Sequence, residues 1–224
     1  EARVIPRISY MEVMELSFFG AKVMHSRSIE PAMQKNIPVW VKNTFNPSCP
    51  GTCIGKDELR ETRVVKAITF IDKVAAITIT GAQMIGRPGV AKHIFSILAD
   101  HQINVMMISQ GSSEANISLI IEEKQVKTAM DALQILKERC VFREIAANED
   151  VCAVAVVGSG MAGMTGTAGR TFGALGRAGI NVMMISQGSS EVNISFVVTE
   201  EMGPRAVQVL HDEFKLSDYG EERR

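Results

Sequence analysis

The sequence has little of several features that mark particular classes of protein. Its 24 basic and 25 acidic residues leave a net charge of −1, and no run of Lys or Arg exceeds two residues. This balance argues against binding to nucleic acid or to an anionic membrane surface. The apolar runs are only strand length, far short of the roughly 18 to 20 residues of a membrane span. The first residues, EARVIPRISY, lack the apolar core of a signal peptide.

Cysteine is also scarce. Four cysteines in 224 residues are too few for a disulfide scaffold, which indicates a reducing, cytoplasmic environment. Cys49 and Cys53 lie close together in NPSCPGTCIG, but no second pair or nearby histidine completes a zinc set. We therefore interpret them as reduced thiols on a turn and expect no metal site. The four histidines show neither metal spacing nor a catalytic pairing.

What the chain does have is an internal duplication. The sequence INVMMISQGSSE at residues 103–114 recurs letter for letter at residues 180–191, a shift of 77 positions. With the same shift, residues 74–123 match residues 151–200 at 25 of 50 positions. Such self-similarity predicts two copies of one fold. Surface loops drift fastest when only packing is at stake, so the identical polar loop SQGSSE indicates shared work for its side chains or backbone.

Each copy is predicted to form a βαββαβ unit. In the first copy VAAITIT alternates as a strand, a glycine loop follows, and apolar residues at helical spacing between 90 and 98 predict a helix. NVMMIS and ANISLII predict a hairpin, and a second amphipathic helix follows. A strand near residues 141–145 completes the ferredoxin-like plan. The predicted fold class is therefore α+β, with two tandem units.

The second copy has no predicted fourth strand after its second helix. A strand without a partner precedes the first copy. After Phe214 the chain is polar, while VVKAITFI at residues 64–71 has the pattern of a strand. Assigning this strand to the second unit leaves no sheet incomplete. The first unit, residues 74–146, then becomes an insertion in the second, residues 64–73 and 147–224. The alternative is an edge strand on the first sheet.

Residues 1–60 do not share the pattern of the repeats. Ser9 and Glu12 form a capping box for a first helix, Gly20 ends it, and a second helix is expected near residues 26–35. The sequence VWVKN then predicts a strand. Such a piece has too little apolar surface to stand alone, so we interpret it as the end of a larger α/β domain.

The glycines of the second copy first suggest a nucleotide site, because Gly158, Gly160 and Gly163 spell G-x-G-x-x-G between a strand and a helix. Three observations argue against it: the first copy lacks the middle glycine, no acidic residue ends the next strand, and a short hairpin follows instead of another βαβ unit. A glycine-lined helix start offers free N–H groups and a positive dipole end to a carboxylate. Both copies keep such glycines, namely Gly86 and Gly89 in the first and Gly163 and Gly166 in the second.

The strand and turn after that helix would form the opposite wall of an amino-acid site. Neutral polar side chains there can hold an ammonium group and a hydroxyl. Turn formation is the other explanation for Asn and Ser, and the simpler one for Ser112 and Ser113. Glutamine is not a usual turn former, so Gln110 and Gln187 are the stronger candidates. Met106, Met107, Met183 and Met184 are interpreted as core residues.

These motifs together resemble a known family. Two βαββαβ units with glycine where the helix begins, followed by NVMMISQGSSE and NIS, are similar to the paired ACT domains of aspartate kinases. The preceding IPRISYMEVMELSFFGAKVMHSRSIEPAMQKNIPVWVKNTFNP resembles the last part of that family's catalytic amino-acid-kinase domain. It includes the FGAKVLHP-type motif, with Ser26 where the family usually has Pro. The resemblance covers nearly the whole chain.

The resemblance implies an enzyme that phosphorylates the side-chain carboxylate of aspartate with ATP and magnesium, under feedback control by an amino-acid end product. The family's phosphate motif and aspartate-binding residues lie before the equivalent of Glu1, so we expect this chain alone to be inactive, with no catalytic residue and no cofactor of its own. Of the family's ATP contacts only Lys22 and Val23 match, and a solvated lysine is the alternative for Lys22. No dinucleotide domain follows Arg224, so we expect the monofunctional form and not a fusion to homoserine dehydrogenase.

The resemblance also implies effector sites between ACT units, and we expect a homodimer paired through the first unit, which would shelter sheet edges. Threonine is the predicted effector, because lysine needs a fixed acidic partner and Met106 and Met183 stand where lysine-sensing relatives tend to carry an acid. Glu114 and Glu191 keep lysine open. A free-standing ACT regulator and a dehydrogenase are the rival classes. The predicted effector-binding residues are Met84, Gly89, Val90, Ala91, Asn104, Val105, Gln110, Gly166, Asn181 and Gln187.

Overall fold

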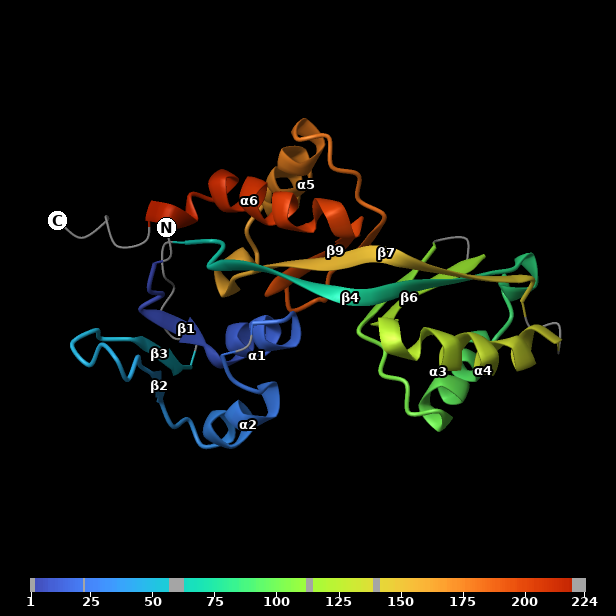
Figure 1. The fold of residues 1–224 in the computed structure, drawn as a ribbon, viewed down its shortest axis with the longest axis horizontal. Helices are drawn as coiled ribbons and strands as arrows, with labels where there is room; N and C mark the ends of the chain where they lie inside the picture. The colour runs from blue at the N-terminus through green and yellow to red at the C-terminus, as the bar shows by residue number, and fades with distance from the viewer. Residues whose placement is uncertain (1–2, 22, 57–62, 112–114, 139–141, 219–224) are drawn as a thin grey trace.

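The computed structural model of the chain describes residues 3–21, 23–56, 63–111, 115–138 and 142–218 (Figure 1). These residues form an N-terminal segment and two βαββαβ units that share one sheet. Among the helices in these ranges, none is long and apolar enough to cross a membrane.

The N-terminal segment is a small α/β piece with its own sheet, in the strand order β1-β3-β2. Its first helix begins at the predicted capping box, because the Ser9 hydroxyl accepts from the Glu12 N–H while the Glu12 carboxylate accepts from the Ser9 N–H. Gly20, at a φ of 95°, follows the helix in the left-handed conformation that favours glycine. The elements are β1 (Arg7–Ser9), α1 (Tyr10–Phe18), α2 (Ser26–Gln34), β2 (Val39–Val41) and β3 (Thr52–Gly55).

The two units share a six-stranded sheet in the order β5-β6-β4-β7-β9-β8. Its centre is a pair of 14-residue strands, β4 (Ala67–Thr80) and β7 (Glu144–Val157). The first part of β4 pairs with the last part of β7, from Ala67 opposite Val157 to Ile71 opposite Ala153, and completes the second unit. The last part of β4 pairs with β6 and with the beginning of β7 in the first unit. The prediction that the first unit is inserted in the second is confirmed.

The continuity of β4 and β7 differs from the separate short strands that the sequence predicted. Polar residues near Asp72 and Glu149 looked like breaks between strands. In the structure the register shifts there, between Ile71 and Val74 and again between Val74 and Ala76. Such bulges accommodate extra residues without ending the strand pair.

The remaining elements follow the predicted order in both units. Each unit runs from a central strand through a short 3₁₀ turn and a helix into a hairpin, and then into a second helix. In the first unit these are η1 (Ala82–Met84), α3 (Val90–Asp100), β5 (Met107–Gln110), β6 (Asn116–Glu122), η2 (Glu123–Gln125) and α4 (Val126–Glu138). In the second they are η3 (Ser159–Met161), α5 (Thr167–Arg177), β8 (Met184–Ser186), β9 (Asn193–Val198), η4 (Glu200–Met202) and α6 (Gly203–Glu213), followed by η5 (Leu216–Asp218).

Each unit has a separate hydrophobic core between its helices and the sheet. In Figure 1 α5 and α6 lie above the sheet, whereas α3 and α4 lie below its other end. Ile77, Ile94 and Leu119 are fully buried in the first core, and Val154, Leu175 and Phe196 in the second. Burying each such side chain contributes about 1.5 to 3 kcal/mol, so the two cores are the main source of stability.

A third cluster joins the N-terminal segment to the shared sheet. Phe19, just after α1, is buried with Val151, Ala153 and Val157 on the side of β7 opposite the second core. Met107 and Met184 from the two hairpins are buried in the same cluster, as core residues, while Met183 is 45% exposed. The position of α1 is therefore set by the sheet that the two units share.

Candidate functional site

The glycine loop of the first unit leads from β4 into α3. Gly86 and Gly89 both have positive φ, at 61° and 92°, and Gly89 is the N-cap of α3 in the left-handed conformation. A glycine cannot cap the helix with a side chain, so the first N–H groups of α3 are directed at whatever lies against the helix start. This is the geometry that binds an anionic group such as a carboxylate.

A cavity of about 320 Å³ lies at this helix start. Gln110, at the end of β5, forms its opposite wall, and Ile117 of β6 contributes an apolar side chain. Five of the predicted effector-binding residues line this cavity together: Met84, Gly89, Val90, Ala91 and Gln110.

Arg87 also lines the cavity, and sequence reasoning missed it. That reasoning relied on features kept in both copies, and the second copy has Met164 at the equivalent position. The signal was present in the sequence, because Arg87 is the basic residue of the loop GAQMIGRPG. Its guanidinium adds a positive charge beside the helix start, which favours a ligand carboxylate and disfavours a ligand ammonium group.

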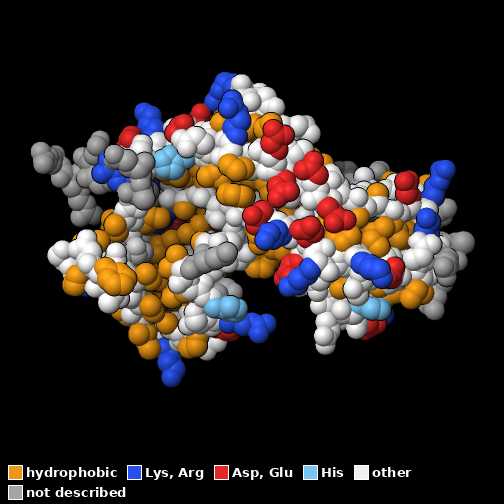
Figure 2. Space-filling view, viewed as in Figure 1, with side chains coloured by type: hydrophobic (Ala, Val, Ile, Leu, Met, Phe, Trp, Pro, Cys, Tyr) orange, Lys and Arg blue, Asp and Glu red, His pale blue; other side chains and the backbone are white. Residues whose placement is uncertain are grey.

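Asn104 and Val105 are not brought into this cavity's lining. Asn104 is exposed and borders a larger cavity of about 1040 Å³, between the N-terminal segment and the first unit. Val105 is half-buried against the first core, so its side chain serves packing. In Figure 2 charged side chains gather beside the hollow between these two parts of the molecule.

The equivalent loop of the second unit has its own internal partner. Gly166 caps α5 with a φ of 87°, as Gly89 caps α3. The N–H of Gly163, however, donates to the carboxylate of Glu191 over 2.6 Å. Asn181 and Gln187 are both exposed, as Asn104 and Gln110 are in the first unit. A carboxylate of the chain itself thus accepts the hydrogen bond from one of the N–H groups that this loop could offer to an anion.

The remaining glycines of the second loop serve close packing. A Cβ on Gly158 would lie 2.4 Å from the carbonyl oxygen of Val64, and one on Gly160 would lie 2.5 Å from that of Arg63. Both distances are too short for a side chain, so glycine is required where the chain approaching β4 crosses the loop. This accounts for the G-x-G-x-x-G spelling and supports the argument against a dinucleotide site.

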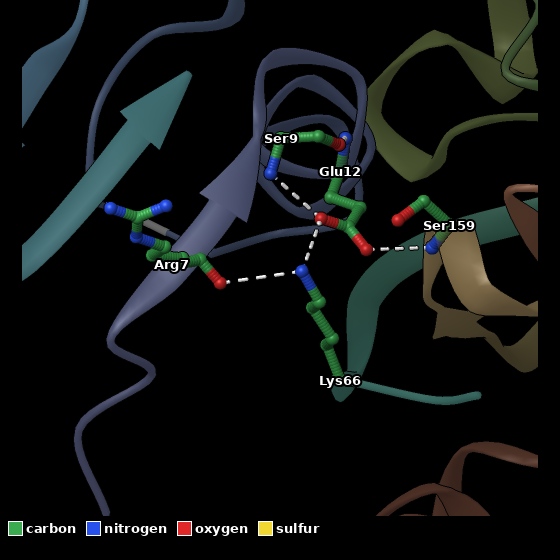
Figure 3. A network of polar contacts seen from close by, with 5 residues as sticks. All are labelled: Arg7, Ser9, Glu12, Lys66 and Ser159. Atoms are coloured by element: carbon green, nitrogen blue, oxygen red, sulfur yellow. Dashed lines mark hydrogen bonds and ion pairs between the residues drawn. The ribbon is translucent and has the colours of Figure 1, made fainter. Parts of the chain in front are cut away.

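A buried polar network joins α1 to the second loop (Figure 3). The carboxylate of Glu12, which is 0% exposed, accepts from the N–H of Ser159 over 2.6 Å and from the N–H of Ser9 over 2.7 Å. The ammonium group of Lys66, 6% exposed, lies 3.2 Å from the same carboxylate and also donates to the carbonyl oxygen of Arg7. A buried carboxylate with this set of partners is fully compensated.

Two carboxylates on α1 have pKa values shifted in opposite directions. Burial alone would raise the pKa of Glu12, but the N–H groups of Ser159 and Ser9 and the charge of Lys66 outweigh it and hold the pKa below 4.5. Burial raises the pKa of Glu15, and the hydrogen bond from the Asn193 amide offsets this only in part. Glu12 is therefore an ionised structural group, whereas the charge on Glu15 is disfavoured.

The predicted ATP contacts, Lys22 and Val23, follow α1 in the sequence. Lys22 lies outside the described residues, and Val23 is 69% exposed at the border of two cavities. Among the residues that the structure describes, no group of three His, Cys, Asp or Glu is placed to hold a metal ion. In the same ranges Cys49 and Cys53 are free thiols.

Comparison with protein families identifies both parts of the chain. The ACT domain family matches residues 77–135 and 154–214, which together make up more than half of the chain. The amino acid kinase family matches residues 1–43. The two ACT matches fall on the two units, and the kinase match falls on the N-terminal segment.

The chain is also similar to known aspartate kinases. The bifunctional aspartokinase/homoserine dehydrogenase of Haemophilus influenzae is 40% identical over 94% of the chain, which covers 26% of that protein. The aspartate kinase of Clostridium acetobutylicum superposes with a TM-score of 0.87 at 32% identity, over 96% of this chain and 50% of its own. E. coli aspartokinase III in complex with lysine and aspartate superposes with a TM-score of 0.74 at 27% identity, over 95% of this chain and 46% of its own. The chain thus spans about a quarter of the first of these relatives.

Proposed function

The chain belongs to the aspartate kinase family, as a tandem-ACT regulatory region preceded by the end of an amino acid kinase domain, and from this we propose that it is the feedback-sensing portion of an ATP-dependent enzyme that makes 4-phospho-L-aspartate. The observation that carries the proposal is the cavity at the start of α3. Its volume of about 320 Å³ is in the range of small-ligand sites, and it combines a helix N-terminus with a polar side chain on the facing strand.

We propose threonine as the effector of the first ACT unit. The N–H groups at Gly89 and Val90 and the charge of Arg87 suit the carboxylate of an amino acid, and the Gln110 amide suits its hydroxyl. Lysine is the second candidate, because E. coli aspartokinase III was solved with it. Arg87 disfavours lysine, since a second ammonium group would face a like charge in the described lining of this cavity.

Calorimetric titration of the 224-residue chain with threonine, lysine and methionine tests this choice. We expect threonine to bind and Gln110→Ala to weaken its binding by about 0.5 to 1.5 kcal/mol, because the substitution removes the amide that would pair with the ligand hydroxyl. Gln187→Ala, at the equivalent position of the second unit, is the matched control and should leave the affinity unchanged. Tight lysine binding without a response to threonine would refute the assignment.

ATP and magnesium belong to the whole enzyme in this proposal. The described residues hold no metal-ligand cluster. Of the two predicted nucleotide contacts, Val23 is the one within the described residues, and it is exposed. We therefore expect the chain alone to form no phosphoaspartate, because phosphoryl transfer needs nucleotide, metal and acceptor positioned together. An assay for ADP release in the presence of aspartate, ATP and magnesium checks this, and measurable turnover would contradict it.

We also propose that the chain forms a homodimer through its first ACT unit. The edge strands of the six-stranded sheet are β5 and β8, and each carries an exposed isoleucine, Ile108 at 47% and Ile185 at 46%. The first unit is the complete inserted module, so we assign the pairing to its edge strand. An edge strand with an exposed apolar side chain is stabilised by pairing with a second copy. Sedimentation at micromolar concentration should give a dimer, and a monomer with and without threonine would contradict it. The cytoplasmic location stays a prediction.

A further inference from the structure

We infer that the glycine loop of the second ACT unit, residues 158–161, is an internal docking surface for helix α1 of the kinase segment, and that Glu12 is the positioning residue that couples this helix to the regulatory pair. The inference rests on the proposed function, because it takes the first loop as the effector site. It assigns helix docking, and not ligand binding, to the second loop. In this scheme the first loop senses the effector and the second transmits its effect.

The Glu12 carboxylate is the centre of the docking contact. Ser159 lies 147 positions along the chain from Glu12, yet its N–H donates over 2.6 Å to this carboxylate, which is 0% exposed. The second carboxylate oxygen accepts from Ser9 of the capping box and from Lys66, which precedes β4. One side chain thereby fixes three parts of the molecule: the start of α1, the approach to β4 and the second loop (Figure 3).

The second loop is shaped for this contact in a way that the first loop is not. Gly160 allows the backbone at Arg63 to lie against the loop, where a Cβ would be 2.5 Å from a carbonyl oxygen. The first copy has Gln83 at the equivalent position. Because residues 63–66 cross the second loop, Lys66 reaches Glu12. The duplicated loops have therefore diverged at the position that admits the backbone of Arg63.

Further contacts hold α1 to the second unit. The Thr69 hydroxyl on β4 donates to the carbonyl oxygen of Phe19 over 2.7 Å, and the Asn193 amide on β9 donates to the Glu15 carboxylate. Phe19 itself is 3% exposed against the sheet. Helix α1 and the residue after it are thus held at β4, at β9 and at the second loop.

Strand β4 connects this docking surface to the effector cavity. Its first part carries Thr69, and Lys66 lies just before it, while its last residue, Thr80, leads through Gly81 into the turn that lines the cavity with Met84. A ligand that shifts this turn therefore acts on the same strand that holds α1. By linkage, a ligand shifts α1 only as far as it binds one arrangement of this strand better than another.

Hydrogen exchange of the full 224-residue chain, with and without threonine, tests the inference. Without ligand, Glu12→Gln should speed amide exchange in α1 at least tenfold, while exchange in α3 stays unchanged. Glu30→Gln, an exposed position on α2, is the matched control and should alter neither helix. In the unsubstituted chain threonine should change the exchange rate of α1 several-fold, and in Glu12→Gln this response should be lost although calorimetry still gives threonine affinity within threefold.

The outcomes separate the inference from the proposed function. Unchanged α1 exchange in ligand-free Glu12→Gln would refute the docking role. A threonine response of α1 that persists in this variant, or that is absent from the unsubstituted chain although threonine binds, would refute the coupling role. If threonine does not bind the unsubstituted chain, the effector assignment fails, and the ligand-free exchange still decides the docking role.

Discussion

The two ACT units carry glycine loops at equivalent positions, and these loops have different partners. In the first unit the loop opens onto a cavity lined by Arg87 and Gln110. In the second its N–H groups donate to two carboxylates of the chain itself, Glu12 at Ser159 and Glu191 at Gly163. Two N–H groups of the second loop are thus bound by carboxylates of the chain, whereas the first loop faces a cavity. The two copies share a similar backbone geometry, and a few side chains determine whether the loop faces a cavity or binds carboxylates of the chain.

Removing the cation from the docking surface should produce the largest effect. Lys66→Met leaves the buried Glu12 carboxylate without its countercharge, and we expect the free energy of unfolding to fall by about 3 to 5 kcal/mol. Urea denaturation at neutral pH measures this. The double variant with Glu12→Gln should recover part of the loss, because no buried charge then remains. A loss below about 1 kcal/mol in the single variant would contradict a buried, coupled pair.

The same variant has a defined pH dependence. The pKa of Glu12 is lowered in the folded protein, so its ionised form stabilises the fold above the unfolded value of 4.5. This contribution is lost as the pH falls from 4.5 through the lowered folded pKa. The difference in stability between the unsubstituted chain and Lys66→Met should therefore shrink below pH 4.5. A difference that stays constant across this window would show that Glu12 does not titrate as the network requires.

Giving the second loop the residue of the first should have the next largest effect. Gly160→Gln places a side chain against the backbone of Arg63, and we expect a loss of about 2 to 4 kcal/mol in the free energy of unfolding. Gly169→Ala is the control, because a Cβ there meets open space within α5 and should stabilise the helix by about 0.5 to 1 kcal/mol. Equal losses in both variants would mean that close packing does not explain Gly160.

The smallest effect is expected at the second internal carboxylate. Glu191→Gln weakens one charge-assisted hydrogen bond on a half-buried side chain, so the free energy of unfolding should fall by about 0.5 to 1.5 kcal/mol. Threonine stoichiometry in calorimetry should stay unchanged. A second binding event in this variant would show that Glu191 alone keeps the second loop from acting as a ligand site.

Much of the fold follows from local pattern and repetition. The shift of 77 residues and the missing last strand were enough to predict two βαββαβ units with one inserted in the other. The Ser9 and Glu12 capping box also follows from the sequence, because its partners are three residues apart. The joining of short strands into β4 and β7 does not, since the polar residues near Asp72 and Glu149 are typical of a loop unless a second strand accommodates the bulge.

The lining of the cavity at α3 was anticipated only in part from the sequence. Met84, Gly89, Val90, Ala91 and Gln110 meet in one cavity, whereas Arg87 has no counterpart in the repeat. The contact of Glu12 with Ser159 spans 147 positions, and Glu12 already had a local role in the capping box. This second role depends on how the folded chain brings distant residues together, which residue spacing in the sequence does not indicate.

The long central strands also bear on how the chain reaches its native state. Ala67 pairs with Val157, about 90 positions away, and every residue of the first unit lies between them. The ladder that closes the second unit therefore forms only after a long loop has been ordered, and contacts of such large sequence separation slow folding. A nascent chain can bury the first core before the residues of the second have been made. The insertion thus favours an order of assembly in which the first unit is complete before the second.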